Sequence, residues 1–337
     1  MKDNKNTLVS HYQRKKIGKV FSLESIASFV RESCGHKFKF QKNVNYFFSI
    51  GILRRVLDSF YAIFKQGNIN HVMGDIHYIG IFLNSKKTIL TIADCVSLVR
   101  LKGIKRFIIW FFWYYIPIRR SAKVITISEY VKKEILSYVN CDSDKIEVIH
   151  VPILLKIKKI KKKYIGSKPN ILHVGSTENK NLSRHVMAIR DIPSTFIFVG
   201  EPSKTQLKFI EKNCKDFIIE SNLTEKGLLD IYDSCDLLLF ASTYEGFGMP
   251  IIEAQARGLP VITSNTTSMP EVAGTGACLV DPCSIDEINS AAKKILGDQS
   301  YREHLISQGY SNLSRFSKDK IAEKYIRVYT EILNRNT

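Results

Sequence analysis

Short apolar runs alternate with amphipathic segments along the second half of the chain. The runs that predict strands are 171–176, 195–200, 216–221, 236–242, 259–264 and 277–281. Segments with helical spacing lie between them, at 181–192, 204–214, 224–235, 249–258 and 285–298. Asn181, Thr224 and Ser284 stand at the starts of three of these helices, where N-caps belong. The alternation is typical of βαβ units and predicts a doubly wound parallel sheet.

The first half has the same character with less regular spacing. Its predicted strands are 6–12, 69–75, 87–94, 123–128 and 145–151, and its predicted helices are 22–33, 52–66, 102–116 and 129–139. Ser128 stands where the N-cap of the last helix belongs. We therefore predict an α/β fold with two domains.

The domain boundaries follow from the composition between these regions. We expect an N-terminal domain over residues 1–153 and a linker over 154–169, where six lysines fall within 156–163. Such a dense run of like charge resists burial. A second domain over 170–317 and a C-terminal helix over 318–337 complete the chain. That helix has an apolar stripe, so it must dock, and it can cross back to the first domain.

Charge is distributed very unevenly between the two halves. Residues 1–168 hold 32 Lys and Arg against 11 Asp and Glu, a balance of +21. Residues 169–337 hold 18 Lys and Arg against 21 Asp and Glu, a balance of −3. Together they give the net charge of +18. The excess indicates an anionic partner such as a membrane surface, a phosphate-bearing lipid or nucleic acid, or else a merely basic soluble surface. A nucleic-acid partner is disfavoured, because the chain lacks the basic and aromatic interleaving of a known binding module.

The location of the protein is suggested by its apolar runs and cysteines. The longest apolar run, 107–118, has twelve residues, whereas about twenty are needed to cross a bilayer. Cations bracket this run, so it suits either a helix in the headgroup region or a buried helix. Seven scattered cysteines without a CxxC pair predict neither disulfides nor a zinc site. With no apolar leader near Met1, we expect a cytoplasmic protein, alternatively one peripheral on the inner face of the cell membrane.

The sharpest chemical signal is the segment 237–264, where a strand, a glycine-containing loop, a helix and a second strand follow in turn. Pro250 stands near the first position of the helix, where its missing N–H costs nothing. Ligands of open parallel sheets bind at this end of the strands, where helix N-termini attract anions. Glu245 in the loop and Glu253 in the helix can each accept two hydrogen bonds from vicinal hydroxyls. Spacing alone leaves open that both are solvated surface charges.

The segment EGFGMPIIE, 245–253, resembles the E-x7-E signature of the retaining GT-B glycosyltransferases of family 4. DIYDSCDLLLFAS before it, ARGLPVITSNTTSMPEVAG after it and ILHVGSTENKNLSRHVMAI at 171–189 are similar to the same family. The likeness is strong over 170–290 and fainter over 69–152. It implies the GT-B fold, with two Rossmann-like domains whose parallel sheets face an interdomain cleft.

The resemblance also assigns roles by position. It implies that Glu245 holds hydroxyls of a donor sugar and that Glu253 binds the ribose of a nucleotide. Lys180 would neutralise the departing diphosphate, so that no metal or other cofactor is required beyond the nucleotide-sugar substrate. The remaining expected donor-binding residues are Gly175, Ser176, Phe247, Gly248 and Met249.

Two departures from the family pattern concern the donor. Ser176 stands where many members have arginine, which leaves the diphosphate to Lys180 and backbone donors, with Arg184 as a further candidate. Ala93 precedes Asp94 where the family often has a histidine. Other candidates for a cleft in the N-terminal domain are His77, which is either structural or directed at a ligand, and Gly18 in a loop after the first strand.

The expected function is therefore transfer of a sugar from a nucleotide-sugar to a glycan or polyprenyl-linked acceptor, with retention of configuration. The likeness suggests cell-surface polysaccharide or lipopolysaccharide assembly. Three alternatives stay open: a catalytically lapsed scaffold that binds sugar nucleotides, an epimerase or phosphorylase on the same fold, and a basic nucleic-acid-binding protein.

Overall fold

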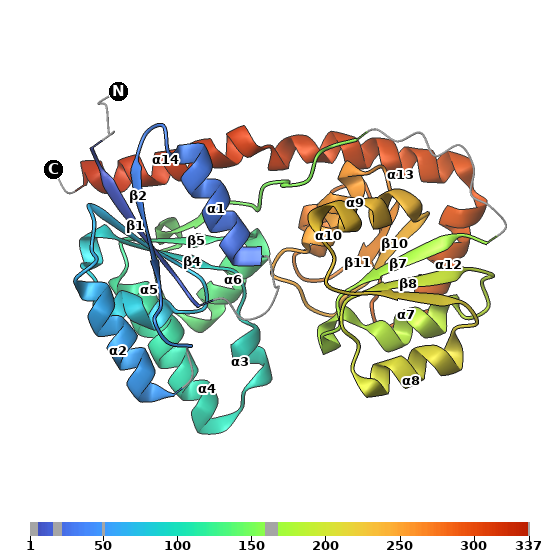
Figure 1. The fold of residues 1–337 in the computed structure, drawn as a ribbon, viewed down its shortest axis with the longest axis horizontal. Coiled ribbons are helices and arrows are strands. Elements are labelled where there is room, and N and C mark those ends of the chain that lie inside the picture. Colours follow the sequence, from blue (N-terminus) through green and yellow to red (C-terminus); the bar gives the residue numbers. More distant parts are fainter. Residues whose placement is uncertain (1–5, 16–21, 49–50, 159–167, 336–337) are drawn as a thin grey trace. The chain divides into compact units, whose positions relative to one another are not determined.

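The computed structural model describes residues 6–15, 22–48, 51–158 and 168–335. It forms two compact units, one of residues 1–152 with 318–337 and one of residues 153–317 (Figure 1). Each unit has a parallel sheet of six strands, so the prediction of two α/β domains is confirmed. Gly18 and most of the lysine-rich segment lie outside the described residues.

The first unit has the strand order β2-β1-β3-β4-β5-β6, with all pairs parallel. This is the flavodoxin-like variant of the doubly wound sheet. The strands are β1 (Leu8–Gln13), β2 (Lys39–Val44), β3 (Ile69–Met73), β4 (Thr88–Ile92), β5 (Lys123–Thr126) and β6 (Ile146–Val148). The helices are α1 (Ser22–Cys34), α2 (Ile52–Ile63), α3 (Val96–Arg100), α4 (Gly103–Ile109), α5 (Ile116–Arg120), α6 (Glu129–Tyr138) and α14 (Lys318–Asn334).

The second unit has the order β12-β11-β10-β7-β8-β9, again all parallel. Counted from β7, this is the 3-2-1-4-5-6 order of the Rossmann fold. The strands are β7 (Asn170–Val174), β8 (Thr195–Val199), β9 (Phe217–Glu220), β10 (Leu237–Phe240), β11 (Val261–Ser264) and β12 (Cys278–Val280). The helices are α7 (Leu182–Ile189), α8 (Lys204–Asn213), α9 (Glu225–Ser234), α10 (Met249–Ala256), α11 (Met269–Ala273), α12 (Ile285–Gly297) and α13 (Gln299–Asn312).

Each predicted strand is present, but the sequence pattern missed β2 and the helices α3, α11 and α13. β2, with the sequence KFQKNV, lies at the edge of its sheet and has no fully buried side chain. An edge strand of this kind needs no apolar alternation, which is the signal on which strand prediction depends. α3 and α11 span only five residues each, too few for a helical period to show.

The predicted N-caps divide into two groups. Ser128, Thr224 and Ser284 each accept a hydrogen bond from a backbone N–H in the first turn, as expected. The prediction for Asn181 is wrong, because it stands at the start of α7 with φ of 62° and its side chain makes no cap. Its Nδ2 instead donates to the carbonyl oxygens of Ala241, at 2.9 Å, and Pro282, at 2.6 Å, so Asn181 fastens α7 to neighbouring loops.

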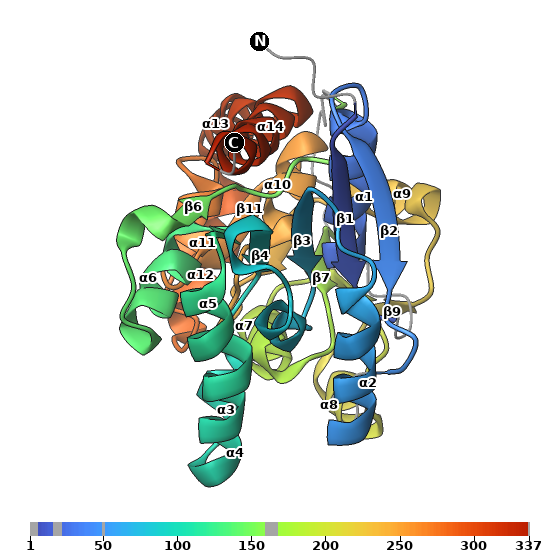
Figure 2. The same ribbon diagram turned by 90° about the vertical axis from the view of Figure 1, so that its left-hand side faces the viewer.

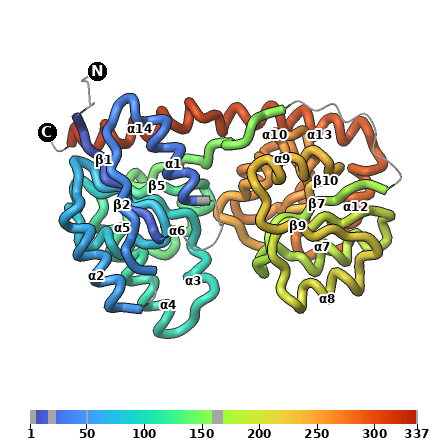
Figure 3. The backbone as a smooth tube through the Cα atoms, viewed as in Figure 1, coloured from blue at the N-terminus to red at the C-terminus, as the bar shows by residue number. Residues whose placement is uncertain are grey.

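The C-terminal helix α14 belongs to the first unit, where it packs along α1 and reaches β3 (Figure 3). Its buried Tyr329 lies between two strands: the hydroxyl is 3.0 Å from Nε2 of His11 on β1 and 2.8 Å from Nδ1 of His71 on β3. Nε2 of His71 lies 2.7 Å from the hydroxyl of Thr91 on β4. This buried polar network fixes the position of α14 on the sheet.

The segment 102–120 is exposed at its start and buried further along. It begins with α4, continues as a π-helical segment, Trp110–Tyr115, and ends with α5. Ile104 and Phe107 on α4 are exposed, whereas Trp113 and Ile118 are buried in the core of the first unit. Among the described residues, none of the helices has both the length and the apolarity that crossing a bilayer requires.

Candidate functional site

The strand order of the second unit brings two distant loops together. β7 and β10 are neighbours in the sheet, with Ile171 paired to Leu237 and Leu172 to Leu238. β7 continues into the loop that begins at Gly175, and β10 into the loop that contains Glu245. The chain adds strands to one side of β7 up to β9 and then to its other side from β10 on, so the strand order reverses between β7 and β10. Doubly wound sheets bind ligands in the crevice outside such a switch point.

Lys180 and Glu245 meet at this switch point although 65 positions separate them. Lys180 ends a short 3-10 turn after β7, and its Nζ lies 2.6 Å from Oε1 of Glu245. The same ammonium lies 4.7 Å from the centre of the Phe240 ring. The two charged side chains are 18% and 12% exposed, so the pair is largely but not completely shielded from water.

Gly175 makes room for the lysine. Its φ of +99° favours glycine, and a Cβ at this position would lie 2.9 Å from Cε of Lys180. The lysine stem therefore passes directly over the backbone at the end of β7. The absence of a side chain at Gly175 is what allows Lys180 to reach Glu245.

Three polar residues hold the Glu245 loop in place. Nδ2 of Asn179 donates to the carbonyl oxygen of Tyr244 at 2.8 Å and reaches Oε1 of Glu245 at 3.4 Å. The backbone N–H of Glu245 donates to Oγ1 of Thr267 at 3.3 Å. The buried hydroxyl of Ser268 lies 2.9 Å from the carbonyl oxygen of Glu245, to which it donates. The sequence prediction missed these supports, although Thr267 and Ser268 fall in a segment that carries the family likeness.

Glu253 lies on α10, which starts directly after the Glu245 loop. The hydroxyl of Tyr232 donates to Oε2 of Glu253 at 2.8 Å. Burial raises the pKa of Glu253, while the hydrogen bond from Tyr232 and the positive charge of Lys180 both lower it. Lys180 therefore touches one carboxylate and acts electrostatically on the other, so the three groups that the sequence singled out gather at one place.

The stretch between the two glutamates presents backbone rather than side chains. The ring of Phe247 is 3% exposed and packs edge-on against Phe316, with ring centres 5.7 Å apart. Gly248 has φ of 97° and precedes the first residue of α10, Met249. The first N–H groups of a helix have no partner within it, so this end of α10 suits an anion.

A buried pair of histidines underlies the site, and the sequence analysis did not single it out. Nδ1 of His173 on β7 lies 2.8 Å from Nδ1 of His185 on α7. Nε2 of His173 lies 2.8 Å from the carbonyl oxygen of Gly175, and Nε2 of His185 lies 3.2 Å from that of Ala241. Burial lowers the pKa of His173 to about 4 and that of His185 well below its usual value. Two neutral histidines carry two ring protons, so two of these three contacts can be hydrogen bonds. The pair lies between the ends of both strands that flank the site.

Ser176 and Arg184 lie near these groups without touching the carboxylates. The carbonyl oxygen of Ser176 accepts a hydrogen bond from Gln206 at 2.7 Å. The guanidinium of Arg184 donates to Oδ1 of Asn181 at 3.0 Å. Neither contact involves Glu245 or Glu253, and the roles expected for Ser176 and Arg184 stay predictions.

The candidates in the first unit have different surroundings. His77 is 3% exposed and lies in the core, with Nε2 3.3 Å from the carbonyl oxygen of Thr91 and its ring against Tyr114. These surroundings favour the structural interpretation of His77. Asp94 is half-buried after β4 and accepts a hydrogen bond from the N–H of Val96 at 3.0 Å. Gly18 lies outside the described residues.

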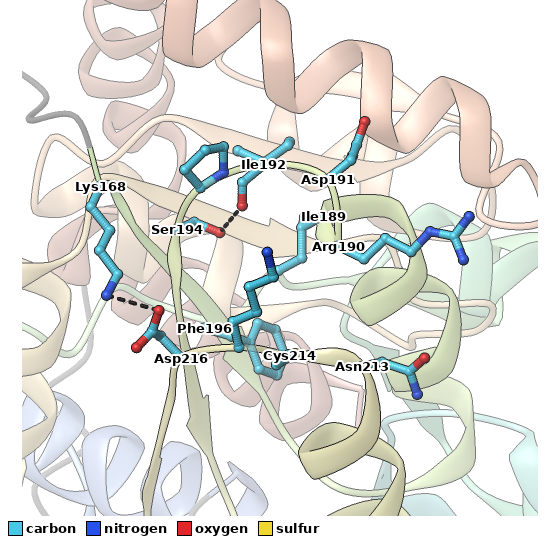
Figure 4. A pocket seen from close by; sticks show the side chains of 12 residues that line it. Lys168, Ile189, Arg190, Asp191, Ile192, Ser194, Phe196, Asn213, Cys214 and Asp216 are labelled. Carbon is cyan, nitrogen blue, oxygen red and sulfur yellow. Dashed lines mark hydrogen bonds and ion pairs between the residues drawn. The ribbon is translucent and has the colours of Figure 1, made fainter.

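A half-open cavity of about 340 Å³ lies at the opposite end of the second sheet (Figure 4). It is lined by the segments that precede β8 and β9, and Lys168 and Asp216 form an ion pair of 2.9 Å at its edge. Because ligands of doubly wound sheets bind at the carboxyl ends of the strands, we place the candidate site at Glu245 and not in this cavity. Within the described ranges, no group of three His, Cys, Asp or Glu side chains is arranged to hold a metal ion.

Comparison with solved structures identifies the class of fold. The structure of Anabaena Alr3699/HepE in complex with UDP and glucose superposes with a TM-score of 0.77 and 14% sequence identity, over 96% of this chain and 99% of that one. WaaG, a glycosyltransferase involved in lipopolysaccharide biosynthesis, gives a TM-score of 0.74 at 14% identity, over 96% and 99% of the two chains. The fold is therefore of the GT-B type, with two Rossmann-like domains.

Sequence comparison finds a family match in the second half of the chain. Residues 156–312, just under half of the chain, match the family described as glycosyl transferases group 1. O-antigen chain mannosyltransferase B of Escherichia coli is 27% identical over 234 residues, which is 62% of this chain and 61% of that protein. O-antigen chain mannosyltransferase RfbU of Salmonella typhimurium is 32% identical over 189 residues, 53% and 52% of the two chains. The matched part thus spans about three fifths of the first of these relatives and about half of the second.

Proposed function

We propose that this protein is a glycosyltransferase that moves a sugar from a nucleotide-sugar to a glycan or polyprenyl-linked acceptor in lipopolysaccharide or O-antigen assembly. The observation that carries the proposal is the contact between Lys180 and Glu245 at the switch point of the second sheet. The names of the relatives support the sugar chemistry, since they are mannosyltransferases of O-antigen chains. A mannosyl donor is therefore the first to test.

In this proposal, each site residue binds a different part of the donor. Glu253 accepts hydrogen bonds from the ribose hydroxyls, and Glu245 accepts them from hydroxyls of the sugar. The diphosphate lies between these carboxylates, against Lys180 and the N-terminus of α10. Lys180 and Glu245 contact each other, so the diphosphate and the sugar hydroxyls lie side by side in this proposal.

The transfer step follows from this placement. The bond between the anomeric carbon and the phosphate oxygen breaks, and the acceptor oxygen bonds to the same face of that carbon, so that configuration is retained. The acceptor proton passes to the leaving phosphate oxygen, and the products are the glycoside and a nucleoside diphosphate. Lys180 and the helix N-terminus stabilise the negative charge that develops on the leaving group, so we propose that no metal is required.

Donor binding is tested first, by thermal-shift measurements with UDP-, GDP-, dTDP- and ADP-sugars, including mannosides. A ligand at a hundred times its Kd stabilises the folded state by about 2.7 kcal/mol, which a melting curve resolves. If no sugar nucleotide stabilises the protein, the proposal is wrong.

The role of Lys180 is tested with Lys180→Met. Removing one preorganised charge from a transition state lowers the rate by roughly 10²–10³-fold, and we expect a loss of that size in transfer to an O-antigen-type acceptor. Lys226→Met is the matched control, because Lys226 is an exposed lysine on α9 of the same unit. Equal rates for the two variants would contradict the role of Lys180. A protein that binds donor yet neither transfers nor hydrolyses it would be the lapsed scaffold instead.

A further inference from the structure

Helix α2 of the first unit is amphipathic in the reverse of the usual sense. Its buried side chains are Asp58, Ser59 and Ala62. Ile52 and Leu53 at its start and Phe64 directly after its end are 80%, 73% and 82% exposed. A helix on the surface of a soluble protein normally buries its apolar stripe and exposes its polar one. α2 does the opposite, because Asp58 and Ser59 are buried while most of its apolar side chains are exposed.

Specific contacts hold α2 in this orientation. The buried carboxylate of Asp58 accepts hydrogen bonds from the backbone N–H groups of Tyr46, at 2.9 Å, and Phe47, at 3.2 Å. The guanidinium of Arg55 lies over the ring of Trp113, 4.5 Å from its centre. These polar anchors fix the inner face of α2, so the apolar outer face is a stable feature of the folded unit.

A second exposed apolar surface lies on α4. Ile104 and Phe107, one turn apart, are 70% and 54% exposed. The Arg55–Trp113 contact joins α2 to the π-helical segment that continues α4. Both helices lie at the lower end of the first unit in Figure 1 and in Figure 2. We call the two surfaces together the apolar face, and define it by Ile52, Leu53, Phe60, Phe64, Ile104 and Phe107.

The exposed charges that α2 and the segment of α4 themselves carry have one sign. Four cations are exposed: Arg54 on α2, Lys105 and Arg106 on α4, and Lys102 directly before α4. The acidic residue of α2, Asp58, is buried, and the sequence from 95 to 128 contains no Asp or Glu. Two copies of this face would bring like charges together, which disfavours self-association. An anionic lipid surface, by contrast, offers both a hydrocarbon boundary and the complementary charge.

We propose that α2 and α4 dock this protein onto an anionic lipid bilayer, with the apolar face in the headgroup and acyl boundary and the four cations at the lipid headgroups. This inference rests on the proposed function and deepens it. A polyprenyl-linked acceptor is itself held in a membrane, so docking would bring the protein to its acceptor. The docking surface lies on the first unit, whereas the donor residues lie on the second, so the two can be tested separately.

The experiment is flotation of the purified full chain with vesicles of phosphatidylcholine alone and of phosphatidylcholine with phosphatidylglycerol. We expect at least tenfold stronger binding to the anionic vesicles, weakened by 0.5 M salt as a charged surface requires. A variant with Ile52→Ser, Leu53→Ser, Phe60→Ser and Phe64→Ser should lose at least tenfold of this binding. A second variant, with Arg54, Lys102, Lys105 and Arg106 changed to Gln, should lose the preference for anionic lipid.

The matched control changes exposed apolar residues of the second unit, with Ile218→Ser and Leu279→Ser, which are 45% and 41% exposed. It should bind vesicles as the parent protein does. Donor-induced thermal shifts on every variant separate the two proposals: retained shifts with lost vesicle binding support the docking surface, whether or not transfer is detected. If the four-serine variant does not fold, vesicle binding by the glutamine variant alone tests the docking surface.

Two results would overturn the inference. One is vesicle binding that is unchanged in both the serine and the glutamine variants. The other is a dimer of the parent protein in sedimentation velocity that the serine variant dissociates, since the apolar face would then be an interface between two copies of this chain.

Discussion

Replacing Tyr329 by phenylalanine removes a single hydroxyl from the buried network that anchors α14. That hydroxyl lies within hydrogen-bond distance of His11 and His71, and burial lowers the pKa of His71 to about 3, which keeps its ring neutral. Tyr329→Phe leaves one ring nitrogen of each histidine without this partner in the core. Each unsatisfied buried group costs about 1–3 kcal/mol, so we expect a loss of roughly 2–4 kcal/mol in the free energy of unfolding.

The same helix provides the control. Tyr325, one turn before Tyr329, is also fully buried, but its hydroxyl makes no hydrogen bond among the described residues. Tyr325→Phe should therefore be neutral or slightly stabilising. Both tryptophans of the chain, Trp110 and Trp113, belong to the first unit, so their fluorescence reports the unfolding of the unit that α14 completes.

Urea unfolding followed by tryptophan fluorescence measures the difference. With a slope of about 1–3 kcal/mol per molar urea, Tyr329→Phe should lower the midpoint by roughly 1–2 M and Tyr325→Phe should leave it nearly unchanged. Equal midpoints for the two variants would refute the reasoning, because the hydrogen bonds of Tyr329 would then contribute nothing to the docking of α14.

Two further predictions concern the second unit. His173 is buried and neutral with a pKa of about 4, whereas a histidine in an unfolded chain titrates near 6.5, so the unfolded state binds more protons between these values. The contribution of His173 to the free energy of unfolding should be fully present above about pH 6.5 and should fall by about 3 kcal/mol towards pH 4. A free energy of unfolding that does not change over that pH range would contradict the burial of a neutral histidine. Gly175→Ala should place a methyl group against the stem of Lys180 at a φ of +99°. We expect this to cost about 1–3 kcal/mol of stability and to weaken donor binding. Calorimetry with the best donor measures the second effect. Donor affinity equal to that of the parent protein would show that the lysine adjusts freely.

Much of the second unit was predictable because its strands are buried on both faces. Parallel strands such as β7, β8 and β10 appear as short apolar runs, and the helices between them keep their helical period. The local order of strand, glycine loop and helix also indicated a ligand at Glu245 and Glu253. The meeting of Lys180 with Glu245 is a matter of strand order, since β7 and β10 are neighbours only in the folded sheet.

The sequence by itself determined which segments are amphipathic, where apolar runs form strands and which residues resemble a family signature. It did not determine which face of a helix is turned inward. The helical pattern of α2 is clear, but it does not predict that Asp58 lies inside and Phe64 outside. The tertiary structure decided that, because the backbone N–H groups that bind Asp58 belong to Tyr46 and Phe47, outside the helix in the loop before α2. Local periodicity separates two faces of a helix, but only packing against the rest of the chain assigns one of them to water.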